Sequence, residues 1–496
     1  MDESLPRNLH VFPKDFIWAS ATAAYQIEGG SEEGGETLSV WDHLRRIPGC
    51  IKDNSDSNLS CEGFKHWKQD VQLLKALGVT HYRFSVSWSR ILPTGKTDKI
   101  NEQGVEFYRN LCLELKANGI EPIITMFHYD FPIQLHEEGG FLNRKSIAWF
   151  TDFARICFEK FGDLVKTWVT FNEIIPNASF GVVPMENLPK FALDPVIPLE
   201  QWNITKRQAP YLAAHHQILA HASVYRLYKE EFYSKQKGKI GIVSGGRAAE
   251  TPDESKESLE AAKRMINWQF LWMNEPIFGD GDYPKIMRDR MDYLAEKEGL
   301  KEILPKFTDE ERKMVKDSAD FIGINWYLSL MVGKYRNDPS NSFMENDGDY
   351  SFYSDNNEKI SGDHWLRNTP NGLIECFKTI RDNYGNVPIL VSENGCADHL
   401  PVQILGDPLN DYHRIRYIRA HVEAIGKAIA DDLNIIGYTA WSLMDNFEWE
   451  DGFAVRFGLY RVDFDSPEKT RTPKKSAFFY RNLIDEQKKI VEKTEL

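Results

Sequence analysis

The sequence has 496 residues, a formal net charge of −14 at pH 7, and 12% aromatic residues that include 13 Trp and 20 Tyr. This acidic balance argues against nucleic acid as a partner, because phosphate binding needs a basic face, and it gives no reason to expect binding to an anionic membrane. No apolar run approaches the length of about 20 residues that spans a bilayer.

The N-terminal stretch MDESLPRNLH is acidic and polar, and the apolar FIWASATAAY that follows is not preceded by the basic leader of a signal peptide. If Met1 is the native start, we expect a cytoplasmic protein. If the sequence is a processed form, a secreted protein is the alternative.

The six cysteines show neither a C-x-x-C pair nor a metal-binding spacing, so no metal site is expected. Cys50 and Cys61 flank a polar loop. A disulfide in an oxidising compartment and two thiols in the cytosol both fit this arrangement. The N-x-S/T sites at Asn58, Asn177 and Asn203 arise easily by chance at this length, so they leave glycosylation open.

Short apolar runs alternate with helical periodicity along the chain. Strands are predicted at 16–20, 80–88, 120–127, 167–173, 239–245, 320–325, 387–393 and 434–442. Helices are predicted at 105–119 and 146–162, where apolar side chains such as Phe150, Ala154 and Phe161 recur at helical spacing.

This alternation predicts a parallel sheet, either open or closed into a barrel. No G-x-G-x-x-G or G-x-x-x-x-G-K-[ST] motif follows a strand, so the phosphate-binding loops of open sheets are missing. Several strands instead end in residues such as Glu173, Asn325, Glu393 and Trp441, as in barrel enzymes. We therefore predict one (β/α)8 (TIM) barrel domain over residues 1–496. The spans 174–238, 246–319 and 328–386 would be long loops on its C-terminal face.

Two of the predicted strands end in glutamates, Glu173 in TFNE and Glu393 in VSENG. A barrel would bring both carboxylates to one rim. Cleavage of a glycosidic bond needs such a pair, because one carboxylate attacks the anomeric carbon while the other protonates the departing oxygen. Either glutamate alone would more simply be a salt-bridged residue at a strand end.

The chain resembles glycoside hydrolase family 1, the β-glucosidases of the (β/α)8 barrel clan, over nearly its whole length. The matching stretches, in family order, are AAYQIEGG, HYRFSVSWSRILPTG, FHYDFP, TWVTFNE, FIGINWY, ILVSENG and WSLMDNFEWEDGF with the later RFGLY. A lone asparagine–glutamate pair would mean little, whereas the full set is specific.

The resemblance implies that Glu173 is the general acid/base and Glu393 the nucleophile. Arg83 would hold Glu393 ionised, and Tyr327 would donate a hydrogen bond to it. Glu173 would carry a proton at the start of the reaction. The side chains implied to bind the sugar are Gln26, His128, Asn172, Asn325, Trp441, Glu448 and Trp449.

The chain departs from the common pattern of the family at several positions near these motifs. Ile174 follows the acid/base where proline is common, Tyr129 replaces a usual Trp, and Trp326 replaces a usual Tyr. Asp451 and Phe453 are also uncommon at their positions. We interpret these changes as tuning of the pocket rim, because both glutamates are present.

The resemblance therefore predicts a retaining β-glycosidase that acts on a small β-glucoside or related glycoside without a metal or organic cofactor. The alternatives are a thioglucosidase of the myrosinase kind and a non-catalytic binding protein of the klotho kind. The sequence does not choose among glucose, galactose and fucose. It also leaves the oligomeric state undecided, with a homodimer as one option.

Overall fold

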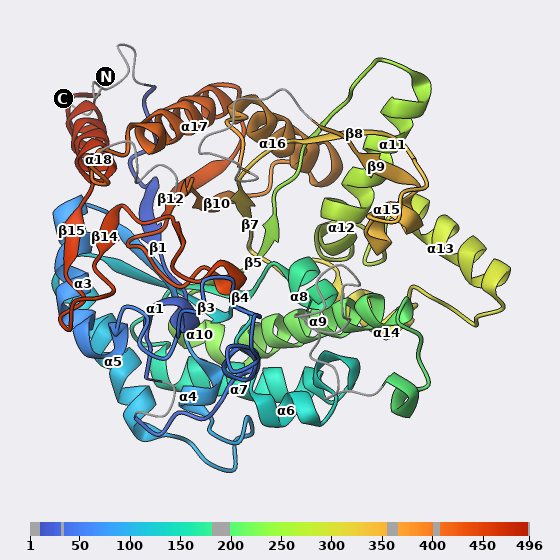
Figure 1. The fold of residues 1–496 in the computed structure, drawn as a ribbon, viewed down its shortest axis with the longest axis horizontal. Helices are drawn as coiled ribbons and strands as arrows, with labels where there is room; N and C mark the ends of the chain where they lie inside the picture. Colours follow the sequence, from blue (N-terminus) through green and yellow to red (C-terminus); the bar gives the residue numbers. More distant parts are fainter. Residues whose placement is uncertain (1–9, 31–33, 181–198, 355–365, 400–406, 495–496) are drawn as a thin grey trace.

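The computed structural model describes residues 10–30, 34–180, 199–354, 366–399 and 407–494. Within them, parallel strands close into an eight-stranded barrel in the order β1-β12-β10-β7-β5-β4-β3-β2 (Figure 1). The barrel strands are β1 Ile17–Ala21, β2 His81–Ser85, β3 Glu121–Phe127, β4 Thr167–Asn172, β5 Lys239–Gly245, β7 Phe321–Trp326, β10 Ile389–Asn394 and β12 Ile435–Trp441. Their bounds lie within two residues of the predicted strands, except that β2 ends three residues before the predicted end at 88. The prediction of a (β/α)8 barrel is confirmed.

The barrel has an apolar interior that is separate from the core between the strands and the surrounding helices. Its lower interior is filled by Ile123, Val169, Val243, Phe321 and Leu390, all buried. Because side chains alternate across a strand, the neighbouring positions pack outward against the helices. The polar strand ends therefore lie above a packed floor.

Helices surround the barrel and also decorate its rim (Figure 1). The longer helices are α3 Gly63–Leu77, α5 Glu102–Ala117, α7 Ser146–Phe161, α9 Gln208–Leu227, α11 Lys256–Ile266, α13 Lys285–Glu298, α16 Pro370–Tyr384, α17 Tyr412–Ala430 and α18 Lys475–Thr494. The shorter ones are α1 Ala24–Ile27, α2 Val40–Leu44, α4 Trp88–Ile91, α6 Ile133–Glu137, α8 Ile174–Phe180, α10 Tyr233–Gln236, α12 Trp272–Phe278, α14 Asp309–Val315 and α15 Phe343–Gly348. Short strands at the rim are β6 Ala249–Glu250, β8 Leu330–Lys334, β9 Tyr350–Phe352, β11 Asp398–His399, β13 Val455–Arg456, β14 Tyr460–Val462 and β15 Arg471–Pro473. The helices α5 and α7 match the two that the periodicity predicted.

The three long spans predicted as loops also contain helices and short strands among their described residues. The clearest case is α9, which packs against α7, α14 and the strand β4. Most of its side chains are buried, so its sequence shows no single apolar face. Because α9 lacks a periodic apolar pattern, hydrophobic periodicity did not predict this helix.

The structure also describes the cysteines that flank the polar loop and two of the N-x-S/T asparagines, and it shows whether any described helix could cross a membrane. Cys50 and Cys61 are both buried and are not joined by a disulfide. The amide nitrogen of Asn177 donates to Gln217 (3.0 Å), whereas Asn203 is exposed. Among the described helices, none has the length and apolar character needed to cross a membrane.

Candidate active site

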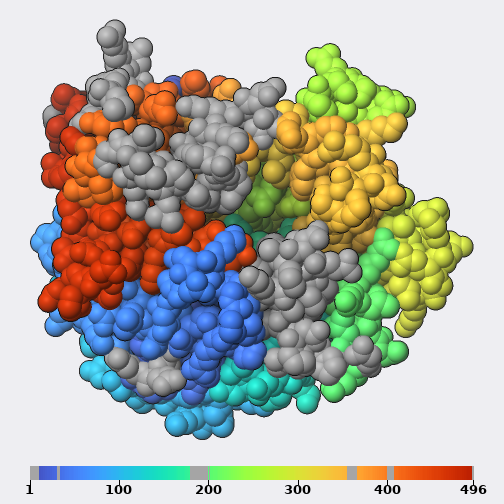
Figure 2. All heavy atoms as spheres, viewed as in Figure 1, coloured from blue at the N-terminus to red at the C-terminus, as the bar shows by residue number. Residues whose placement is uncertain are grey.

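The barrel brings polar strand ends together below a hollow in the molecular surface. Figure 2 shows this hollow near the centre of the face drawn in Figure 1, with green atoms at its floor and orange, red and blue segments around it. Glu173 directly follows β4, and its backbone N–H donates to the carbonyl of Val243 on β5 (3.0 Å). Glu393 lies on β10 opposite Asn325 of β7, just after a register shift that re-aims the strand end.

Arg83 of β2 occupies the centre of the site, with 1% of its side chain exposed. Its Nη1 donates to Glu393 Oε1 (2.7 Å) and to the carbonyl of Ser392 (3.0 Å). Nη2 donates to Asn172 Oδ1 (2.7 Å), and Nε donates to Thr125 Oγ1 (3.0 Å). The guanidinium therefore connects β2 to β3, β4 and β10. Its positive charge contacts Glu393, one of the two glutamates.

Glu393 is held by two donors. Besides Arg83, the phenol of Tyr327 donates to its Oε2 (2.8 Å). Burial nevertheless raises the pKa of Glu393 to about 7, because the lowering effect of Arg83 does not outweigh desolvation and the nearby Glu173 adds repulsion. The expected ion pair is present, but burial weakens its hold on the ionised form.

Glu173 receives only neutral donors. Asn325 Nδ2 donates to its Oε1 (2.8 Å), and the phenol of Tyr129 donates to its Oε2 (3.1 Å). Its backbone φ of 44° lies in the left-handed region, which is strained for a glutamate and recurs at functional sites. Asn325 also donates to Asn172 (3.1 Å), so hydrogen bonds connect Glu173 to Glu393 through Asn172 and Arg83.

A second polar group of the site lies between α1 and the loop after β12. Gln26 is fully buried, and its Nε2 donates to Asn446 Oδ1 (3.0 Å) and to the carbonyl of Phe447 (2.9 Å). Its Oε1 is buried without a hydrogen-bond partner. Glu448 lies 3.4 Å from Gln26 Nε2, and burial followed by the charge of Asp451 raises the pKa of Glu448 to about 8.

Aromatic rings form a wall beside these groups. The ring of His128 is nearly parallel to those of Trp441 and Trp449, with centroid separations of 5.9 and 6.0 Å and interplanar angles of 10° and 14°. Burial, and then the charge of Arg83, hold the pKa of His128 well below its usual range, so its imidazole is neutral. The ring of Tyr25 also stacks on that of Trp449, with a centroid separation of 6.3 Å.

The structure therefore places each site residue predicted from the sequence in one of three contacting groups. Arg83, Asn172, Asn325 and Tyr327 share one hydrogen-bond network with both glutamates. Gln26 and Glu448 contact each other, and His128, Trp441 and Trp449 stack together. Electrostatic coupling of Glu448 to Glu393 links the second group to the first.

The sequence matches glycosyl hydrolase family 1 over residues 8–489. The chain belongs to this family. It is 37% identical over 480 residues to Myrosinase 1 of Brevicoryne brassicae, covering 95% of this chain and 98% of that protein. It is 36% identical over 481 residues to the cytosolic beta-glucosidase of Homo sapiens, with the same coverage. A solved structure of aphid myrosinase superposes with a TM-score of 0.88 at 36% identity, covering 96% of this chain and 99% of that one.

Membership of family 1 makes the protein a retaining O-glycoside hydrolase of the β-glycosidase class. The family motifs did not point to the contact between Tyr129 and Glu173, since Tyr129 is a departure from the pattern. The only sequence signal for this contact came from the neighbouring residues His128 and Asp130, which place position 129 at the end of β3.

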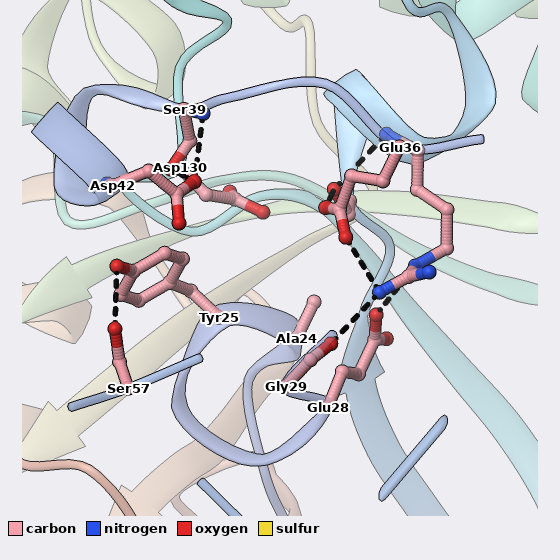
Figure 3. A pocket seen from close by; sticks show the side chains of 11 residues that line it. Ala24, Tyr25, Glu28, Gly29, Glu36, Ser39, Asp42, Ser57 and Asp130 are labelled. Carbon is pink, nitrogen blue, oxygen red and sulfur yellow. Dashed lines mark hydrogen bonds and ion pairs between the residues drawn. The ribbon is translucent and has the colours of Figure 1, made fainter. Parts of the chain in front are cut away.

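An acidic cavity lies beside α1 (Figure 3). Its lining includes Glu28, Glu36 and Asp130, and burial raises the pKa of both Glu36 and Asp130 to about 8. Arg90 pairs with Glu28 (3.0 Å) and Glu36 (2.6 Å). In the part of the chain that the structure describes, no group of acidic, histidine or cysteine side chains is arranged to hold a metal ion. The cavity is lined in part by residues of α1 and by Asp130 in the loop after β3.

Proposed function

We propose that this protein is a β-glucosidase that removes terminal non-reducing β-D-glucosyl residues from small glycosides, with residues 1–496 forming one catalytic domain. The observation that supports this proposal is that the two linked glutamates have different partners. Arg83 contacts Glu393, whereas Glu173 receives hydrogen bonds only from the neutral donors Asn325 and Tyr129. Such a pair suits double displacement, which needs one ionised and one protonated carboxyl group.

In the first half of the reaction, Glu393 Oε attacks the anomeric carbon. The bond from that carbon to the glycosidic oxygen breaks, and Glu173 gives its proton to the departing oxygen. Arg83 and Tyr327 are proposed to orient Glu393. The mechanism requires the transferred proton on Glu173, and Arg83 supports this assignment because its guanidinium favours charge on Glu393.

In the second half, the roles of Glu173 reverse. Glu173, now ionised, takes a proton from a water molecule as the water oxygen bonds to the anomeric carbon. The bond to Glu393 breaks, which restores the Glu393 carboxylate and returns the proton to Glu173. Glucose with retained configuration is the product.

The remaining residues are proposed to bind the glucosyl unit. The unpartnered Oε1 of Gln26 supports this role, since a buried acceptor without a partner is costly until a hydroxyl reaches it. Glu448 would accept further hydroxyls, and Trp441 would carry the C–H face of the ring. His128, Asn172, Asn325 and Trp449 would complete the pocket.

The second candidate is a thioglucosidase, which the similarity to Myrosinase 1 of Brevicoryne brassicae favours. A thiolate leaves without a proton, so an S-glycoside has less use for an acid than an O-glycoside. The presence of a glutamate at position 173, which can supply that acid, supports the O-glycosidase. The two carboxylates together also argue against a non-catalytic binding protein.

A panel of substrates tests the proposal. In assays from about pH 4 to pH 8, we expect 4-nitrophenyl β-glucoside to be hydrolysed best toward neutral pH, faster than the β-galactoside and β-fucoside and faster than a glucosinolate. Glu393→Ala should abolish turnover, and added azide should restore it as the α-glucosyl azide.

Each failure has a different meaning. Faster hydrolysis of the glucosinolate would favour the thioglucosidase, and faster hydrolysis of another epimer would change the sugar. Undiminished activity of Glu393→Ala would discard the nucleophile. No hydrolysis by the wild-type protein would favour a binding role.

A further inference from the structure

Tyr129 stands at the end of β3, two residues after Phe127, with a backbone φ of 73°. This left-handed conformation turns the chain at the rim, where the aromatic ring lies edge-on to Trp449 at 5.3 Å and 63°. The ring is partly buried in the same wall as His128. The side chain is therefore fixed at two points, its backbone turn and its ring packing.

The direction of the hydrogen bonds at the Tyr129 phenol follows from Arg83. Because Arg83 donates to Asn172 Oδ1, the other end of this amide is its Nδ2, which faces Tyr129 and donates to the phenol oxygen (3.2 Å). With that acceptor position used, the phenol proton is directed to Glu173 Oε2 (3.1 Å).

Glu173 is then bound by a donor on each oxygen, Asn325 on Oε1 and Tyr129 on Oε2. Two donors suit an ionised carboxylate, which accepts at both oxygens, better than a carboxylic acid, which must donate from one. Hydrogen bonds to a charged acceptor are roughly twice as strong as those between neutral groups.

We propose that Tyr129 is a positioning residue for the acid–base step: its phenol, oriented by Asn172, fixes Glu173 and stabilises the ionised form that acts as base when the glucosyl-enzyme is hydrolysed. This inference rests on the proposed function, because it takes Glu173 to be the acid/base. It also gives a role to a position where the family usually has Trp.

Other charged and titratable groups act on the same carboxylate, so the effect of Tyr129 must be separated from theirs. Burial raises the pKa of Tyr129 itself well above its usual range, so the phenol stays protonated and keeps donating. Glu393 and Tyr327 interact electrostatically with Glu173. Arg83 contacts the adjacent Asn172, His128 lies beside Tyr129, and Glu448 acts on Tyr327. None of them is altered when only the hydroxyl of Tyr129 is removed.

The test is Tyr129→Phe, which keeps the ring and its packing on Trp449. We expect the alkaline limb of kcat/KM against pH to move to higher pH by about one unit, because the ionised form loses a charge-assisted hydrogen bond. With 2,4-dinitrophenyl β-glucoside, whose departure needs little acid help, hydrolysis of the glucosyl-enzyme should slow about tenfold and a burst of phenolate should appear.

The matched control is Tyr25→Phe, which removes another phenol from the same aromatic wall. Tyr25 bonds Ser57 (2.7 Å), and its ring stacks on Trp449. This variant should keep the wild-type alkaline limb. If Tyr129→Phe folds poorly, 3-fluorotyrosine at position 129 provides a second measurement. Its more acidic phenol is a stronger donor, so the limb should move to lower pH.

An alkaline limb that stays in place, or that moves to lower pH in Tyr129→Phe, would overturn the inference, as would a wild-type limb with 3-fluorotyrosine. Failure of the proposed function gives a different result: the wild-type protein would not hydrolyse the glucoside, or Glu173→Ala would weaken good and poor leaving groups equally. The two failures are therefore distinguishable.

Discussion

Arg83 Nη1 and Glu393 Oε1 lie 2.7 Å apart in a buried ion pair, with 1% and 6% of the two side chains exposed. No hydrogen bond or ion pair among the described residues joins Arg83 directly to Glu173. The guanidinium thus makes two neighbouring carboxyl groups unequal. Four predictions follow from this asymmetry and from the groups around it.

Removal of the guanidinium should cost both activity and stability. In Arg83→Met, Glu393 would remain buried with only Tyr327 as donor, so the acidic limb of kcat/KM should rise by more than one pH unit and activity at pH 6 should fall at least about tenfold. Loss of one partner of a buried pair should lower the free energy of unfolding by about 3–5 kcal/mol. Steady-state kinetics and urea unfolding measure the two effects.

Arg83→Lys is the control for this prediction, because it keeps the charge but not the planar fork. It should fall between wild type and Arg83→Met in both measurements. Equal kinetics for the wild type and Arg83→Met would show that the ion pair does not govern Glu393.

The pH dependence of the wild-type enzyme should have its acidic limb close to neutrality. Glu393 must be ionised to attack, and its pKa of about 7 is raised by burial, so activity should be lost as pH falls through about 7. The limb belongs to the coupled carboxyl pair and not to one residue. A kcat/KM profile measures it, and an acidic limb at the ordinary glutamate value would contradict the prediction.

Glu173→Ala should separate substrates by their leaving groups. The 2,4-dinitrophenolate ion leaves unaided, so glucosylation with that substrate should fall less than about tenfold, whereas an alkyl β-glucoside should lose about 10²–10⁴-fold. Pre-steady-state kinetics measures the first step. Added azide should accelerate the second step, since the base that activates water is gone. Glu393→Ala is the contrasting variant, and it should lose activity toward both substrates.

Asp451 should tune the carboxyl group that is proposed to bind sugar hydroxyls. Asp451 is the largest charge that raises the pKa of Glu448, so Asp451→Asn should lower that pKa by up to about one unit. Because an ionised acceptor binds hydroxyls more strongly, the rise in glucose affinity with pH should occur at lower pH in this variant. Competitive inhibition by glucose measures the shift.

Glu450→Gln is the matched control, because Lys52 pairs with both Glu450 (3.2 Å) and Asp451 (2.8 Å). It breaks one of these ion pairs without removing the charge that acts on Glu448. The pH dependence of glucose affinity should then remain that of the wild type. A shift as large as that of Asp451→Asn would assign the effect to Lys52 instead.

The strands and the two glutamates could be predicted because their signals are local. Each barrel strand is a short apolar run with polar residues at its end, and Glu173 and Glu393 stand where parallel strands share one rim. The helix α9 could not be recognised in the same way, because burial on several sides removes its periodic pattern.

Energetic detail was also beyond the sequence. The resemblance correctly indicated a contact between Arg83 and Glu393, but the pKa of Glu393 depends on how completely the pair is desolvated. Likewise, the hydrogen bond from Tyr129 to Glu173 joins residues 44 positions apart, through a loop and a strand end whose conformations no motif encodes.

The pairing of β1 with β12 closes the cylinder with strands from opposite ends of the polypeptide. A fragment ending before Ile435 would leave β1 and β10 with unpaired backbone groups, and it would lack Trp441 and Glu448. Such a fragment should aggregate through its open edges and should not behave as a smaller enzyme. During synthesis, the barrel can thus close only after β12, which ends at Trp441, has emerged from the ribosome.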